Sequence, residues 1–125
     1  MKRVLALAAV SEAATGLALV IVPSLVGRLL LGAELTGVSI PVARVAGLAL
    51  VALGLACWPG SDAGSGLARA LRGMWCYSML VTLYLAYLGI RNEWVGVLLW
   101  PAVAIHALLT FLLARTWLKD RQSKG

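Results

Sequence analysis

The sequence predicts an all-α integral membrane protein, a bundle of four transmembrane helices that forms one domain over its 125 residues. Apolar residues make up 62% of the chain and charged residues only 13%, whereas soluble globular proteins carry roughly 25% charged residues. A chain of this composition cannot hide its apolar surface from water. A helix needs about 20 apolar residues to cross the hydrocarbon core of a bilayer, and apolar runs close to that length, with at most one charged residue each, occur four times.

The four runs set the order of the predicted transmembrane helices. Each run lacks Lys, Arg and Asp, apart from Arg44 near the start of the second. With their ends included, the predicted helices cover residues 4–22, 42–58, 70–90 and 94–117. Together they account for more than half of the chain, which leaves no room for a separate soluble domain.

The connections between the helices have different characters. Residues 24–32 place leucines around a single Arg28, which predicts a short amphipathic helix in the membrane interface. The stretch 59–66 is rich in Gly, Ser and Pro and predicts a flexible linker between two helical hairpins. The last connection is only Arg91-Asn92-Glu93, so the third and fourth helices should be tight antiparallel neighbours.

The distribution of basic residues predicts the orientation. Cytoplasmic loops of membrane proteins carry an excess of Lys and Arg. With both termini cytoplasmic, the inner side holds eight basic residues and the outer side three. The inner residues are Lys2, Arg3, Arg69, Arg72, Arg115, Lys119, Arg121 and Lys124, and the outer residues are Arg28, Arg44 and Arg91.

Two other interpretations of the basic residues are weaker. The net charge of +6 does not indicate nucleic-acid binding, because the basic residues are scattered at helix ends and form no basic face with interleaved aromatic residues. Lys2-Arg3 and Ser11-Glu12-Ala13 could mark a cleaved signal peptide. However, the apolar run resumes at once through Val22, which favours a transmembrane helix.

Small residues three or four positions apart occur in every predicted span, and such spacing lets helices approach closely in lipid. The predicted helix-packing positions are Gly16, Ala43, Gly47 and Gly54. Trp75, Tyr77, Trp94, Trp100 and Trp117 lie mostly near helix ends, as expected of an interfacial aromatic belt.

Three polar side chains are predicted to form a layer inside the membrane. Glu12 is nine residues beyond Arg3, and His106 is nine residues before Arg115. At a rise of 1.5 Å per residue both lie about 13 Å from the cytoplasmic end, and Thr82 lies at about 15 Å. We expect the Glu12 carboxyl to face the bundle interior and to hydrogen-bond to His106 or Thr82 first, and to Arg44 second.

Both a functional and a structural role are open for Glu12. An ionisable group inside a membrane indicates a proton or ligand site by default, because placing a charge there costs several kcal/mol. Burial favours the neutral carboxyl, however, and a neutral carboxyl can simply hold helices together. Arg44 either extends to the lipid headgroups or turns inward, where it would keep Glu12 ionised.

Motifs of familiar catalytic and metal sites are missing from the sequence. We find no glycine-rich phosphate loop and no His-Glu-x-x-His. One histidine and two separated cysteines make a poor metal site, and haem ligation by His106 has no second signal. The sequence therefore names no catalytic residue, metal site or cofactor.

The first half of the chain resembles a known group of membrane proteins. Its first helix ends at Pro23, Gly27-Arg28-Leu29-Leu30-Leu31-Gly32 follows, and Arg44-x-x-Gly47 opens a helix that continues to Leu53-Gly54-Leu55. This pattern is similar to small bacterial four-helix membrane proteins of the DoxX-like and related uncharacterised groups. The resemblance implies a compact four-helix bundle, in some members accessory to a redox enzyme. Glu12 is not part of that pattern.

A second resemblance rests on Glu12 alone. Small multidrug-resistance transporters are also short four-helix proteins with an essential Glu in the first helix, and Glu12 matches that position in outline. The linkers here are longer, and the third helix lacks the glycine pattern of that family. The strong charge bias also disfavours the dual insertion seen there.

Three classes of function follow. The leading hypothesis is a non-enzymatic, multi-pass protein of the bacterial cytoplasmic membrane, acting as an accessory or assembly subunit or binding a lipid or quinone within the bundle. Its partners would be the lipid bilayer and a second membrane protein or another copy of itself. The rival is a proton-coupled transporter that uses Glu12 with help from His106. An enzyme is third.

Overall fold

The computed structural model describes residues 2–60 and 65–125, and most of these residues lie in helices. These ranges contain five α-helices and no strand: α1 (Lys2–Ile21), α2 (Pro23–Leu31), α3 (Ser39–Ala56), α4 (Ser65–Arg91) and α5 (Leu99–Lys124). All but α2 are long and apolar enough to cross a membrane. The predicted all-helical fold, with four such helices and a short one after the first, is therefore confirmed.

Three helix ends differ from the sequence expectation by five residues or more. The third long helix, α4, starts at Ser65 instead of residue 70, so the end of the predicted linker 59–66 is helical. The last helix starts at Leu99 instead of residue 94, because the backbone N–H groups of Gly96 and Leu98 bond to α2 and not within a helix. It also continues seven residues past 117 to Lys124. An Asp120–Lys124 pair one turn apart, with N···O 2.9 Å, supports this extension.

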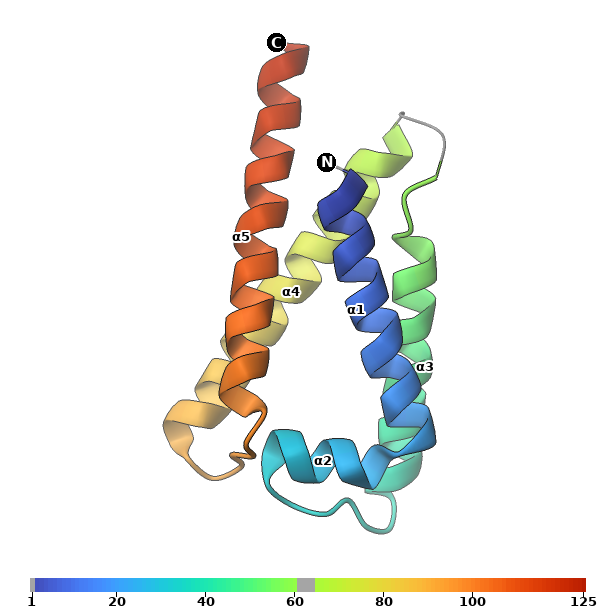
Figure 1. The fold of residues 1–125 in the computed structure, drawn as a ribbon, viewed down its shortest axis with the longest axis vertical. Coiled ribbons are helices and arrows are strands. Elements are labelled where there is room, and N and C mark those ends of the chain that lie inside the picture. The colour runs from blue at the N-terminus through green and yellow to red at the C-terminus, as the bar shows by residue number, and fades with distance from the viewer. Residues whose placement is uncertain (1, 61–64) are drawn as a thin grey trace.

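The helices form two hairpins, visible in Figure 1 as α1 beside α3 and α4 beside α5. Each hairpin packs far more closely within itself than against the other. The start of α1 and the end of α5 lie at the same end of the molecule, and α2 lies across the opposite end (Figure 1). A site that uses residues of both hairpins must therefore form where they touch.

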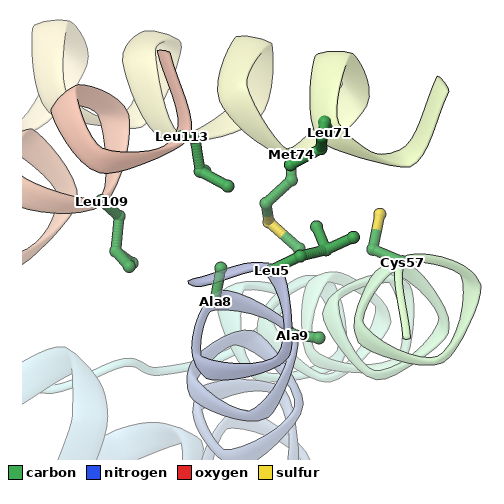
Figure 2. Close-up of a cluster of buried hydrophobic side chains, with 8 residues drawn as sticks. All are labelled: Leu5, Ala8, Ala9, Cys57, Leu71, Met74, Leu109 and Leu113. Carbon is green, nitrogen blue, oxygen red and sulfur yellow. The ribbon is translucent and has the colours of Figure 1, made fainter. Parts of the chain in front are cut away.

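One junction of the hairpins is an apolar cluster near the start of α1, shown in Figure 2. Leu5, Met74 and Leu113 are fully buried there. The complete cluster is Leu5, Ala8, Ala9, Cys57, Leu71, Met74, Leu109 and Leu113. Because it draws on α1, α4 and α5 and on the residue that follows α3, it joins all four long helices.

The second junction is at the far end of α2. The last carbonyls of a helix have no partner within it, and here Leu29 O and Leu30 O accept hydrogen bonds from the N–H groups of Leu98 and Gly96, at 2.8 and 3.0 Å. Gly32 ends α2 with φ 73°, a left-handed conformation that glycine adopts freely. The segment before α5 is thereby bonded to the first hairpin through its backbone.

The orientation inferred from the basic residues gives a labelling prediction. With Cys57 and Cys76 replaced by alanine, Asn92→Cys should react with a membrane-impermeant maleimide in bacterial spheroplasts, because the α4–α5 turn is expected outside. Gly66→Cys should react only after lysis. Residues 61–64 of the predicted cytoplasmic linker lie outside the described residues. Labelling of Gly66→Cys in intact spheroplasts would refute the orientation.

Candidate functional site

Glu12 is the one acidic side chain buried within the described ranges. It lies in the middle of α1, on the surface that also buries Ala8, Ala9 and Gly16. The residue is 1% exposed, so its carboxyl faces the bundle interior. An acidic group in such surroundings is costly unless it is neutral or has a polar partner.

Within the described residues, the ion-pair partner of Glu12 across the hairpin junction is His106 of α5. The distance from His106 Nδ1 to Glu12 Oε1 is 3.7 Å, which exceeds the length of a hydrogen bond. Both atoms are buried, and neither has a hydrogen-bond partner among the described residues. Buried polar atoms are normally hydrogen-bonded, so this pair has an unused capacity to bind a polar group.

Tyr77 of α4 completes the polar cluster, which we define as Glu12, Tyr77 and His106. Its side chain lies close to the Glu12 carboxyl, and its ring meets the His106 ring edge-on, with centroids 6.3 Å apart and planes at 73°. The sequence does not reveal this role, because a Tyr near a predicted helix end suits an aromatic belt. No spacing rule links Tyr77 to Glu12, and only the packing of α4 on α1 brings them together.

Thr82 does not make the hydrogen bond expected of it. Its hydroxyl donates a 2.7 Å hydrogen bond to the carbonyl of Ser78, four residues earlier in α4. Thr110 of α5 bonds in the same way to the carbonyl of His106. The expected hydrogen bond from Thr82 to Glu12 is absent from the described residues, because threonine in a helix often bonds back to its own turn.

Arg44 is exposed on α3 and forms no ion pair within the parts of the chain that the structure describes. The inward pairing with Glu12, one of the two alternatives from the sequence, is therefore not present. Glu12 has no Lys or Arg within ion-pair distance in those ranges, and His106 is the only basic side chain within that distance. Nothing on the first hairpin therefore holds the carboxyl as an anion.

The glycine positions control how α1 faces the second hairpin. A β-carbon on Gly47 would lie 2.5 Å from the carbonyl oxygen of Gly16, and one on Gly54 would lie 2.6 Å from that of Ala9. The backbones of α1 and α3 thus touch directly at two levels. Ala43, on the same side of α3, is half-buried. With this surface of α1 fixed on α3, Glu12 is directed toward His106.

The cluster offers hydrogen-bonding groups and little else chemically. A carboxyl, an imidazole and a phenol can each donate or accept a hydrogen bond, depending on protonation. In the described parts of the chain no three His, Cys, Asp or Glu residues lie together as a metal site would need. The arrangement suits recognition of a small polar group or transfer of a proton.

Comparison with known protein families, curated proteins and solved structures finds no match for this chain. Its function must therefore be inferred from the site itself.

Proposed function

We propose that the protein binds a small, mostly apolar molecule with a polar head, a quinone or a lipid, between its two hairpins, and that Glu12 and His106 hold the head. The observation that carries this proposal is the pair of buried, unbonded atoms, Glu12 Oε1 and His106 Nδ1, which face each other at 3.7 Å. An oxygen atom about 2.8 Å from each of them would satisfy both.

A quinone fits these groups particularly well. Its carbonyl oxygens accept hydrogen bonds, which a protonated Glu12, a protonated His106 nitrogen or the Tyr77 hydroxyl can donate. Its reduced form carries hydroxyl groups, and these can donate hydrogen bonds to the same carboxylate or imidazole. The ring and tail are apolar, as are the neighbouring Ala8 and Leu109. A site of this kind is mostly apolar with a few convergent polar groups.

The cellular setting is part of the same proposal. The basic residues favour a multi-pass protein of the bacterial cytoplasmic membrane with both termini inside. The resemblance of the first half to DoxX-like proteins favours an accessory or assembly subunit of a membrane enzyme, with the bound molecule as the shared ligand. The partner would be a second membrane protein or another copy of this chain.

The test uses Glu12→Gln, which keeps the shape of the side chain but cannot ionise. Binding of decylubiquinone to the purified protein in lipid nanodiscs is measured by quenching of tryptophan fluorescence. We expect Glu12→Gln to weaken binding about tenfold, the value of one hydrogen bond to an ionisable group, without changing helicity. Glu34→Gln, which alters an exposed carboxyl of the α2–α3 connection, is the matched control. Equal binding by both variants and the parent would refute the proposal.

Proton-coupled transport of a cationic substrate is the second candidate. It is favoured because Glu12 is buried at the boundary of two separately packed hairpins, where movement of one against the other would expose it. Transport predicts that proteoliposomes accumulate ethidium only when a pH gradient is imposed, and that Glu12→Gln abolishes accumulation. A ligand-binding accessory protein predicts no accumulation in either case.

A further inference from the structure

The last turns of α5 carry a second site, remote from the polar cluster. In Figure 1 this end of α5 extends beyond the start of α1. A surface hollow of about 520 Å³ opens there, with Val4 of α1 on one side and α5 on the other. Leu112, Arg115, Thr116 and Lys119 line it from α5. Their spacing of three and four residues places them on one face of the helix.

The hollow has an excess of positive charge. Asp120 also lines it, but its carboxylate pairs with Lys124 at 2.9 Å. Arg115 and Lys119 are exposed and have no ion-pair or hydrogen-bond partner among residues 2–60 and 65–125. Two cationic groups one helical turn apart are therefore free to bind one anion, whereas the Thr116 hydroxyl between them donates to the carbonyl of Leu112.

An apolar hollow of about 330 Å³ adjoins the first on the surface of α5. Arg115 and Lys119 line it too, together with Phe111, Ala114 and Leu118. Phe111 is 62% exposed and Leu118 is 54% exposed. The two basic side chains thus lie between a hollow of mixed polar and apolar lining and an apolar surface, an arrangement that suits an amphipathic anion.

The position along α5 matches the boundary of a membrane. Residues 99–114 carry no Asp, Glu, Lys or Arg, and Arg115 is the first charged residue of the helix. Trp117 follows two positions later, with the Arg121 guanidinium 4.6 Å from its ring centre. Trp and basic residues concentrate at the level of the lipid headgroups, so this part of α5 belongs there.

We infer that Arg115 and Lys119 bind the phosphate of an anionic phospholipid, with an acyl chain lying along Phe111, Ala114 and Leu118. Guanidinium groups bind phosphate through two parallel hydrogen bonds, and a lysine adds a point charge. The apolar hollow favours a lipid over free phosphate, because a soluble anion would leave that surface unused. This inference involves none of the residues of the polar cluster and stands independently of the proposed function.

The test is native mass spectrometry of the detergent-solubilised protein, titrated with phosphatidylglycerol or phosphatidylcholine of identical acyl chains. Each basic side chain near an anionic lipid favours it about fivefold, so we expect the first phosphatidylglycerol to bind about 25-fold more tightly than phosphatidylcholine. The double variant Arg115→Gln, Lys119→Gln should abolish this preference. Inorganic phosphate at millimolar concentration should not displace the lipid, whereas displacement would assign the site to a soluble anion and overturn the lipid proposal.

Two controls separate a built site from general attraction. Arg69→Gln with Arg72→Gln removes the same charge from exposed positions of α4, and should leave most of the preference intact. Arg115→Lys with Lys119→Arg keeps the charge and should retain the preference. If the α4 variant loses as much preference as the α5 variant, or if the parent binds both lipids equally, the proposed site does not exist.

Discussion

Replacement of Gly47 by leucine will separate α1 from α3 and lower the free energy of unfolding by about 3 kcal/mol, the upper part of the range for overpacking. The reason is that even the first side-chain carbon would lie 2.5 Å from the Gly16 carbonyl oxygen and 2.9 Å from the Leu19 β-carbon. A flexible side chain could move aside, but the backbone of a neighbouring helix cannot. Close backbone approach is also a main source of helix association in lipid.

Gly73 provides the matched control, because it too lies inside a long helix, α4, and a β-carbon there would meet nothing within 4 Å. Thermal unfolding of Gly47→Leu and Gly73→Leu should be compared in one detergent. We expect a large loss of stability for the first and little change for the second. Equal melting of the two variants would show that Gly47 does not face another helix.

Gly96→Ala should break the junction between α2 and the segment that precedes α5. A β-carbon on Gly96 would overlap the Leu29 carbonyl, and it would lie 2.8 Å from the Gly32 nitrogen. The substitution should therefore remove the hydrogen bonds from Gly96 and Leu98 to α2. Two lost hydrogen bonds correspond to about 2 kcal/mol, and the hairpins should separate at this end.

Hydrogen exchange read by mass spectrometry on peptides that cover residues 95–99 measures this effect directly. These amides should exchange faster in Gly96→Ala, while peptides from α1 and α3 should keep the rates of the parent. Gly60→Ala is the control, since Gly60 has open space around it. Unchanged exchange in Gly96→Ala would show that the two hydrogen bonds do not hold the segment.

The helices were predictable from sequence because crossing a bilayer requires long apolar runs, and α1, α3, α4 and α5 each contain one. The start of α5 was not predictable in the same way. Trp94 and Val95 are apolar, like the helix that follows, but the N–H groups of Gly96 and Leu98 bond to Leu30 and Leu29 instead of within that helix. Such a pairing between distant backbone segments leaves no pattern in the local sequence.

The candidate site, like the helices, was predictable from the sequence only in part. Depth along each helix was enough to match Glu12 with His106, because rise per residue converts sequence position into height. Rotation about each helix axis is set by packing, which height does not reveal. That is why Tyr77 was assigned to an aromatic belt, and why Thr82 was expected to reach Glu12 when its hydroxyl bonds to Ser78 instead.

The position of the polar pair on two separate hairpins has a consequence for biosynthesis. His106 is translated about 90 residues after Glu12, a delay of roughly 5–20 s at about 5–20 residues per second. During that time the nascent first hairpin must enter the membrane with its carboxyl unpartnered by the second. The direct backbone contact of Gly16 with Gly47 lets α1 and α3 associate before α4 emerges from the ribosome. The first hairpin can therefore form before the second hairpin is synthesised and packs against it.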